Sequence, residues 1–580
     1  MRRGVNRLCG ALALCAALTA AGCGGKNGLT NETGPQSKRG GELTVLSLGD
    51  VTGLDPGYWY YGYDYQALAQ PTQRALYAFK PAATTPSPDL ATAMPQTSSD
   101  GRTVTIKIKP NIRYSPPLAD RVVKSADVKY AIERTFKASV RNAYSAIYYG
   151  AIAGAGAYKS GSAQEITGIQ ATDDTTLVLR LRRPAGVISN AQALALPGTV
   201  PVPADYAQRH DEQPVSTYGR HQVFTGPYMI ANDGKGKITG YEPGRRLRLV
   251  RNPSWDPRTD DRPAYLDKIT FLAGTGVEQA SRRILAGKGL ASGDYAAPPV
   301  NVLRSALSTR RDQLAIVPSQ GTRYVALNTT VKPFDNVNVR RAAAAAIDRE
   351  ALRLTRGGPP LGTIATHFLA PSISGFEQAG GAAGTFGFTK PPKGDLALAR
   401  RYLRKAGYAS GRYSGRPLPF VADDRPPGSV TAQAVQRQLE RLGFRFAVRR
   451  VSRTQSYLSL CGAPRARVAV CANGAWPKDI PDPQGLLDPV FDGERIVPSG
   501  SANWSNVDDP ELNAGFDLAA EETDSQERAE AYAEIDRTVT GRAYVIPWLW
   551  DNQIAFASQD VSGVPNRFTA SWDMAYMSLR

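Results

Sequence analysis

The chain has little histidine and little cysteine, and beyond its first residues it has no long hydrophobic run. Only three histidines occur among 580 residues, and no two stand at the spacing of a metal-ligand pair. Zinc sites and histidine-based catalytic triads therefore have little material available. The Gly-x-Ser-x-Gly sequence of an exposed serine nucleophile is also missing. These absences argue against an enzyme such as an envelope hydrolase, and we predict no catalytic residue, no metal ligand and no cofactor.

The chain is strongly basic, with 70 Lys and Arg against 52 Asp and Glu and a formal charge of +18. Along the sequence these cations are scattered, and no basic run alternates with aromatic residues as a groove that follows a nucleic-acid strand requires. We therefore predict no nucleic-acid partner. We attribute the charge to a GC-rich genome, which favours arginine codons, and to a basic surface that suits an anionic cell envelope.

The N-terminus has the pattern of an export signal. Arginines at positions 2, 3 and 7 precede an apolar run over 8–21, which is too short to span a bilayer comfortably. The run ends in Leu18-Thr19-Ala20-Ala21-Gly22-Cys23, which is similar to a bacterial lipobox, although Ala20 stands where leucine is commoner. We predict that Cys23 is lipidated and anchors the chain. The alternative is an ordinary secretory signal with a chance cysteine.

After cleavage before Cys23, two further cysteines remain, Cys461 and Cys471. Exported proteins fold in an oxidising compartment, so we predict a disulfide between them. Two buried free thiols are the alternative. Residues 24–40 are polar and glycine-rich and are interpreted as a flexible tether.

An aromatic cluster, Tyr58-Trp59-Tyr60-Tyr61-Gly62-Tyr63-Asp64-Tyr65, follows the first predicted strand at 42–48. Two interpretations remain open. The cluster either packs between two lobes or forms one wall of a ligand cleft.

Alternation of apolar and polar residues predicts strands at 103–109 and 174–181. Between them, 125–134 has helical spacing, with Ser125 as a candidate cap. These elements predict an α+β insertion over 80–217.

The later half has the pattern of an α/β domain. A strand at 418–421, a helix at 430–442 and a strand at 444–449 predict a right-handed parallel unit. Just upstream, Asp395 is placed to cap a helix that ends at Gly407.

Several segments resemble the family-5 extracellular solute-binding proteins, the peptide and nickel receptors of bacterial ABC importers. The strongest stretch runs from Tyr324 to Glu350, with Asn328, Pro333 and the Ala346-Ile347-Asp348-Arg349 run. Further matches occur in order at 123–128, 225–228, 249–255 and 399–408. Most of these residues are interpreted as structural, such as Gly226 and Gly407, where a side chain would obstruct the backbone.

The resemblance implies an α/β, two-lobed periplasmic-binding-protein-like fold with a hinge and an additional α+β subdomain on lobe one. The limits that we predict are a signal peptide at 1–22, a tether at 23–40, lobe I at 41–79, 218–320 and 544–580, its insertion at 80–217, and lobe II at 321–543.

One segment, Ala475-Trp476-Pro477-Lys478-Asp479, matches the stretch that lies in the cleft of peptide-binding relatives. The resemblance implies that Asp479 accepts the α-ammonium group of a peptide, with Trp476 beside it and Trp504 as a further cleft residue. Lys478 departs from some relatives and is placed to compete for the carboxylate. The alternative is that Asp479 is only a turn residue beside prolines.

The resemblance therefore implies a monomeric, lipid-anchored receptor on the extracytoplasmic face of the cell membrane, which captures peptides and delivers them to an ABC permease with cytoplasmic ATPases. An oligosaccharide, an opine or a metal chelate is the alternative ligand, although the shortage of histidine argues against bare nickel. A signalling or chaperone lipoprotein with the same fold is the alternative function.

Overall fold

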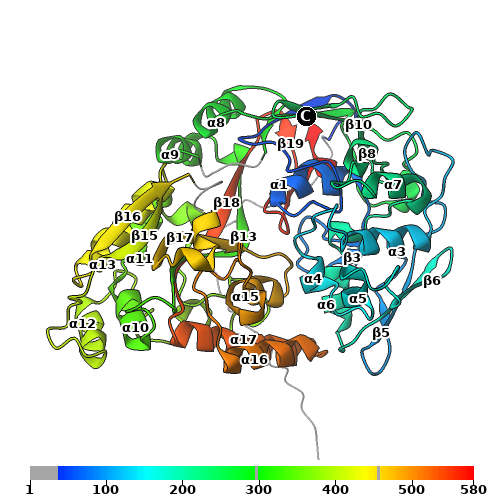
Figure 1. Ribbon diagram of the computed structural model, residues 1–580. Coiled ribbons are helices and arrows are strands. Elements are labelled where there is room, and N and C mark those ends of the chain that lie inside the picture. The colour runs from blue at the N-terminus through cyan, green and yellow to red at the C-terminus, as the bar shows by residue number, and fades with distance from the viewer. Residues whose placement is uncertain (1–36, 294–297, 453–457) are drawn as a thin grey trace, which may run out of the picture.

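The computed structural model describes residues 37–293, 298–452 and 458–580, which form two α/β lobes and a third, smaller unit. In Figure 1 lobe I lies at the top with the C-terminus, lobe II at the left and below, and the smaller unit at the lower right. The predicted signal peptide, Cys23 and residues 24–36 of the tether lie outside the described residues. Within the described ranges, none of the helices combines the length and the apolar character that a membrane span requires. The predicted two-lobed α/β fold is confirmed.

Lobe I is built on a six-stranded sheet in which β1 runs parallel to β11 and β12, while β10 is antiparallel to its neighbours. Along β1, Leu43 and Val45 are fully buried, as expected for a strand with one face in the core. The strand order is β12 (Leu290–Ser292), β1 (Glu42–Leu46), β11 (Lys268–Leu272), β10 (Arg246–Arg251) and β8 (Tyr228–Ile230), and β9 (Tyr241–Glu242) also pairs with β10. Helices α8 (Val277–Ala286) and α9 (Val300–Thr309) pack at one end of this sheet.

Lobe II is built on a second six-stranded sheet. Its order is β14 (Gly362–Thr363), β18 (Val545–Phe556), β13 (Leu314–Leu327), β17 (Val470–Pro477), β15 (Leu418–Asp423) and β16 (Phe446–Val451). Strands β15 and β16 are parallel and are joined through α13 (Gly428–Glu440), which confirms the predicted strand–helix–strand unit. Because β16 has one neighbour only, it forms the edge of the sheet.

The helices of lobe II cover both faces of its sheet. The carboxylate of Asp395 accepts the backbone N–H of Leu398 at 2.8 Å, so the predicted cap of α12 is confirmed. The helices are α10 (Val337–Ala346), α11 (Arg349–Arg356), α12 (Leu396–Lys405), α13, α14 (Leu458–Cys461), α15 (Gln484–Phe491), α16 (Pro510–Glu521) and α17 (Ser525–Gly541).

The smaller unit is the predicted insertion, with a four-stranded antiparallel sheet and its own core. Its strand order is β4 (Gln96–Thr97), β5 (Thr103–Lys107), β7 (Thr176–Arg180) and β6 (Ile169–Asp173), and its helices include α3 (Ser125–Arg134), α4 (Ser145–Tyr148), α5 (Ala155–Lys159), α6 (Val187–Ala193) and α7 (Ala204–Asp211). The capping prediction for Ser125 is wrong. Its hydroxyl donates to the carbonyl of Asp173, and the carboxylate of Asp127 instead accepts the N–H of Lys124 at the helix start.

Strands β13 and β18 pass from one lobe to the other side by side. Residues 314–318 of β13 pair with 552–556 of β18, the register then shifts, and 322–326 pair with 545–550. The first set packs in the lobe I cores and the second in the lobe II cores. The return to lobe I therefore lies near Asp551, several residues after the Tyr544 expected from the sequence, because residues 545–550 still pack in lobe II.

The residues that carry the family resemblance brace the backbone. Asp348 caps α11 by accepting the N–H of Ala351, and the buried guanidinium of Arg349 donates to the carbonyl of Pro547 at 3.0 Å. A Cβ on Gly226 would lie 2.6 Å from the backbone of Thr72, which explains the need for glycine there.

Candidate functional site

The loop 478–483 joins β17 to α15 in lobe II and reaches into lobe I and its insertion. We call it the crossing loop. Ile480 at its centre is 2% exposed and packs within the core of the insertion. The crossing loop therefore connects lobe II with lobe I and its insertion, beside the point where β17 pairs with β13.

Asp479 lies in the crossing loop between two phenols of the other lobe. Tyr60 donates its O–H to Oδ1 and Tyr148 donates its O–H to Oδ2, both at 2.9 Å. Burial raises the pKa of Asp479 to about 7, and the two hydrogen bonds offset only part of this rise. The groups that lower its pKa are neutral, so this partly exposed carboxylate has hydrogen-bond donors but no countercharge.

A carboxylate in this state can accept more than two hydrogen bonds, because its two oxygens together offer about four lone-pair positions. A ligand ammonium would supply both further donors and the missing positive charge. The geometry therefore suits the recognition of a cationic group enclosed between the lobes.

Lys478 does not compete for this carboxylate. Its ammonium donates to the carbonyl of Phe568 at 3.0 Å and lies 5.5 Å from the centre of the Phe568 ring. Burial lowers the pKa of Lys478 to about 7. The predicted competition is therefore wrong, since Lys478 is directed toward the C-terminal segment of lobe I.

Asp482 holds the far end of the crossing loop. Its carboxylate forms a two-pronged ion pair with Arg528 of α17, at 2.9 and 3.0 Å, and also accepts the hydroxyl of Ser189 from the insertion at 3.3 Å. Arg528 fixes the loop within lobe II, while Ser189 adds a contact between the lobes.

Another carboxylate near the crossing loop, that of Asp488 in α15, is buried and was not singled out from the sequence. It is 2% exposed, and its Oδ2 accepts the side-chain amide of Gln484 at 2.9 Å. Burial raises the pKa of Asp488 to about 7. Burial also raises the pKa of Tyr148, to which the charge of Asp479 and, less, that of Asp488 add. No sequence signal singles it out, because an aspartate inside an apolar helix is recognisable as buried only once the packing is known.

The two tryptophans predicted for the cleft have different surroundings. The indole N–H of Trp476 donates to the carbonyl of Gly485 at 3.2 Å, so the ring is fixed beside the crossing loop. Trp504 is 8% exposed and packs in the lobe II core near Tyr324. Trp476 lies three residues before Asp479 in the sequence and packs beside the crossing loop, whereas Trp504 lies inside lobe II. Their ligand contacts remain predictions.

The aromatic cluster contributes to packing within lobe I and between the lobes, whereas its role as a wall of a ligand cleft stays a prediction. Trp59 is fully buried in the lobe I core, whereas Tyr60 reaches Asp479 across the lobes. Tyr148, the second phenol, comes from α4 and was not singled out from the sequence. Its only sequence signal is a run of tyrosines at 144, 148 and 149.

Within the part of the chain that the structure describes, no group of three or more His, Cys, Asp and Glu is arranged to hold a metal ion. His367 is buried, with one ring nitrogen 2.7 Å from Asp536 and the other 3.0 Å from the carbonyl of Gly381. His210 stacks on His221 at 4.3 Å. These contacts are structural.

Cys461 and Cys471 are joined by a disulfide, with their Cα atoms 6.2 Å apart. Both are buried beside β17, the strand that leads to the crossing loop. The bond ties α14 to this strand.

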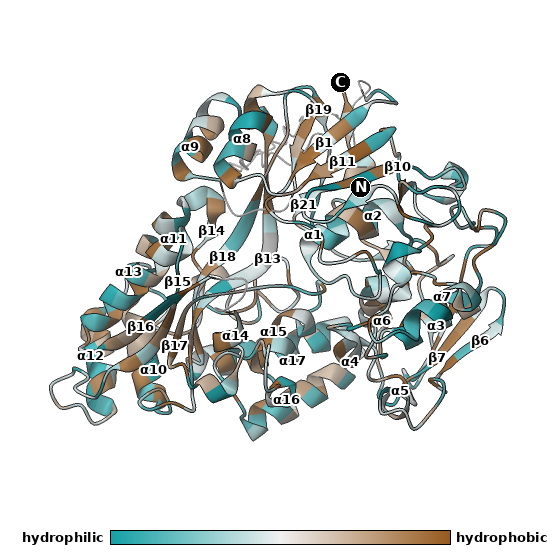
Figure 2. Ribbon diagram, turned by 45° about the horizontal axis from the view of Figure 1, so that its top comes forward, coloured by the Kyte–Doolittle hydropathy of each residue, from teal (hydrophilic) through white to brown (hydrophobic). Residues whose placement is uncertain are grey.

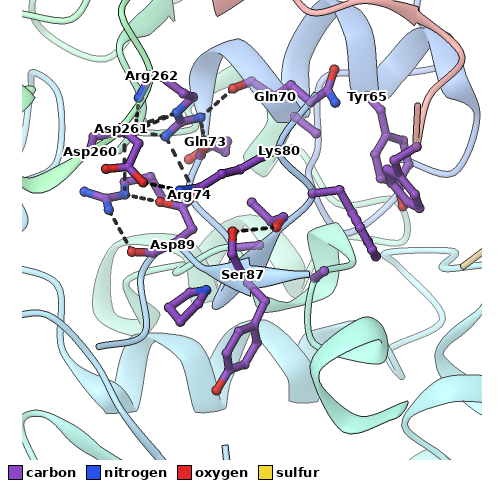
Figure 3. Close-up of a pocket in the computed structure, with 18 of the residues that line it drawn as sticks. Tyr65, Gln70, Gln73, Arg74, Lys80, Ser87, Asp89, Asp260, Asp261 and Arg262 are labelled. Carbon is purple, nitrogen blue, oxygen red and sulfur yellow. Dashed lines mark hydrogen bonds and ion pairs between the residues drawn. The ribbon is translucent and has the colours of Figure 1, made fainter. Parts of the chain in front are cut away.

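A separate cavity of about 100 Å³ lies within lobe I and its insertion (Figure 3). Most of its acidic and basic lining residues pair with one another, as in Arg74 with Asp89 at 2.7 Å and Arg262 with Asp260 at 2.6 Å. Because these charges are already compensated, we interpret the lining as a polar network that joins the insertion to lobe I. None of the residues that line it belongs to lobe II.

Comparison with known proteins agrees with this architecture. The model of the bacterial extracellular solute-binding proteins, family 5, matches residues 85–496. The chain is 24% identical over 403 residues to a probable deoxycholate-binding periplasmic protein of Escherichia coli (strain K12), covering 69% of this chain and 68% of that protein. It is 22% identical to di/tripeptide-binding protein 1 of Pseudomonas aeruginosa (strain UCBPP-PA14), covering 87% and 88%.

Among solved structures, the clavulanic acid biosynthesis oligopeptide binding protein 2 superposes with a TM-score of 0.81 at 29% identity, covering 93% of this chain and 96% of that one. These relatives are binding proteins rather than enzymes. Because the family model matches most of its length, the chain belongs to the bacterial extracellular solute-binding proteins, family 5.

Proposed function

We propose that the chain is a lipid-anchored, extracytoplasmic receptor of an ABC importer, which captures peptides between its lobes and delivers them to a membrane permease with cytoplasmic ATPases. The observation that carries the proposal is the carboxylate of Asp479, which lies between the lobes, is partly exposed and is held by two neutral phenols. Peptides carry an ammonium group that fits this acceptor. Relatives named for peptides support the same ligand class.

Capture follows from closure of the lobes about β13 and β18. A ligand stabilises the closed form only by the difference between its affinities for the closed and open forms. Asp479 provides such a difference, because an ammonium would meet the carboxylate alone in the open form and the carboxylate with Tyr60 and Tyr148 around it in the closed form. Ile480 and Ser189 add contacts made only on closure.

The proposal also covers export. We propose that Cys23 is diacylated, that the mature chain acts as a monomer outside the cytoplasm, and that the Cys461–Cys471 bond is formed there. Thiol labelling of the exported, unreduced protein tests the bond, because rapid labelling of both cysteines would contradict it.

Cys23→Ala is expected to release the protein from membranes, because the variant has no thiol to acylate and two acyl chains are needed for stable attachment. Fractionation of cells that express the parent and the variant measures this. Ser37→Ala is a matched control that leaves the signal unchanged and should stay membrane-bound. A Cys23→Ala protein that sediments with membranes as the parent does would contradict the anchor.

Incubation with a peptide library, followed by native mass spectrometry, tests the proposed ligand class.

A further inference from the structure

Half of the excess positive charge of the chain lies on one end of lobe II. Residues 396–450 hold twelve Lys and Arg and only three Asp and Glu, a net charge of +9 against +18 for the whole chain. All twelve basic side chains are exposed. They lie on α12, α13, β16 and the loops between these elements, at positions 400, 401, 404, 405, 412, 416, 425, 437, 441, 445, 449 and 450.

The cations are concentrated in this stretch of the sequence, and the fold keeps the elements that carry them together. Figure 1 places α12, α13 and β16 together at the left margin of lobe II, and Figure 2 shows hydrophilic positions alternating with hydrophobic ones on these elements. The interpretation of the basic residues as dispersed is therefore wrong for this region. Helices α12 and α13 and strand β16 follow one another along the chain, with only β15 between them, and lie at the same end of the lobe.

Printed contacts connect these residues across the loop 408–416. A Cβ placed on Gly411 would lie 2.8 Å from Nη1 of Arg404 and 3.1 Å from Cβ of Arg400. Both arginines therefore flank the loop. Within the loop, Arg412 donates to the carbonyl of Arg441 at 3.1 Å. Arg445 donates to the carbonyl of Gly415 at 2.8 Å. The basic residues 400, 404, 412, 441 and 445 thus lie around one loop, and we call this surface the arginine face.

The arginine face has a rigid base. Tyr413 stacks on Phe444 at 4.8 Å and contacts Tyr408 edge-on at 5.6 Å beneath the loop. Tyr413 and Phe444 are buried in the lobe II core. The guanidinium groups are therefore carried by an ordered support.

The charges of the arginine face are not compensated from within. Among the residues that the structure describes, none of the twelve cations takes part in an ion pair, whereas basic residues elsewhere commonly do, as in Arg282 with Glu278 or Arg537 with Glu530. Eleven of the twelve are arginine, whose planar guanidinium matches the two oxygens of a phosphate better than an ammonium does.

We propose that the arginine face docks on the anionic headgroups of a phospholipid membrane. A broad, exposed surface of arginines suits a plane of phosphodiesters, and each cation near such a surface adds to the attraction. The aromatic residues among the cations, Tyr402 and Tyr408, are only partly exposed, whereas a single-stranded nucleic acid would require a row of exposed rings on which its bases stack.

The proposed lipid anchor would keep the arginine face near the phospholipid headgroups. A tether over residues 23–40 could reach at most about 60 Å when fully extended, so the lobes would remain close to the bilayer. Docking through lobe II would hold the receptor in one orientation on the membrane. Lobe I would remain free to open and close relative to lobe II. The inference goes beyond peptide capture and uses only the proposed attachment to a membrane.

The test uses the full chain with Cys23→Ala, so that no acyl chain contributes to binding. Co-sedimentation with phosphatidylcholine vesicles that contain a minority of phosphatidylglycerol is expected, with much less on pure phosphatidylcholine and a loss at high salt. Adding Arg400→Glu, Arg404→Glu and Arg441→Glu should weaken binding to the mixed vesicles on the order of a hundredfold. None of these three side chains donates a hydrogen bond in the described structure.

The matched control carries Arg102→Glu, Arg245→Glu and Arg283→Glu, which are exposed on the insertion and lobe I and change the net charge by the same amount. It should retain most of the binding. Equal losses in the two triple variants, or no preference for phosphatidylglycerol, would overturn the proposal. Tighter binding of the parent to single-stranded DNA or polyglutamate than to the mixed vesicles would also overturn it, in favour of a nucleic-acid or acidic protein partner.

Peptide binding by the Arg400, Arg404 and Arg441 variant should equal that of the parent, because the arginine face lies away from the crossing loop. A loss of vesicle binding with intact peptide binding therefore separates this inference from the proposed receptor function.

Discussion

Asp479→Asn is expected to weaken the binding of a peptide with a free N-terminus by a hundredfold or more, on the order of 3–5 kcal/mol. The variant removes the charge that would pair with the ammonium and leaves that cation enclosed without a partner. Because Lys478 is bound to backbone carbonyls of lobe I, it does not weaken the pair in advance. Isothermal calorimetry of the parent and the variant measures the loss.

A comparison of four combinations makes this test specific. Acetylation of the peptide's N-terminus should weaken binding to the parent but add little further loss in Asp479→Asn, since both changes remove the same interaction. Asp424→Asn, at an exposed carboxylate of lobe II, is the matched control and should bind like the parent. Additive losses, or full affinity for the acetylated peptide, would mean that Asp479 does not bind the amine.

Arg134→Met is expected to lower the free energy of unfolding of lobe I by about 3–5 kcal/mol. Arg134 is fully buried in α3 and forms two-pronged ion pairs with Asp55, at 2.6 and 2.7 Å, and with Asp211, at 2.6 and 2.8 Å. The pairs hold the pKa of Asp211 below its usual range despite burial. Methionine fills a similar volume but leaves two buried carboxylates without a countercharge.

Urea unfolding followed by circular dichroism measures this loss. Arg282→Met is the matched control, because its ion pair with Glu278 is more than half exposed and pairs of this kind contribute about 0.5 kcal/mol. Asp55→Asn and Asp211→Asn, added to Arg134→Met, should restore part of the stability by removing the uncompensated charges. An Arg134→Met protein as stable as Arg282→Met would show that the ion pairs of Arg134 with Asp55 and Asp211 do not stabilise the junction of the insertion with lobe I.

Local patterns in the sequence were sufficient for much of the fold. Alternation along 103–107, the Asp395 cap and the strand–helix–strand unit at 418–451 each depend on neighbours within a few residues, so the sequence carries their signal directly. The prediction that Ser125 caps α3 was wrong because a distant contact, not a local one, determined the orientation of its hydroxyl. Ser and Asp three positions or fewer apart both offer a cap, and tertiary contact with Asp173 decided which of them is used.

The site could be predicted only in part. Asp479 followed from the family resemblance, but Tyr148 lies 331 residues away along the chain and Tyr60 lies 419 away. Contacts of this kind depend on how the lobes meet, and nothing local encodes them. The arginine face is a similar case, because the positions of its cations along the sequence do not reveal that α12, α13 and β16 share one end of the lobe.

The most direct test of peptide capture between the lobes is native mass spectrometry of the Cys23→Ala chain. The protein is first freed of retained ligand by unfolding and refolding, and is then incubated with a mixture of short peptides, their N-acetylated counterparts and deoxycholate, which has no amine. The account predicts one-to-one complexes with free-amine peptides that the Asp479→Asn variant does not form. Retention of deoxycholate or acetylated peptides in place of free-amine peptides would contradict it.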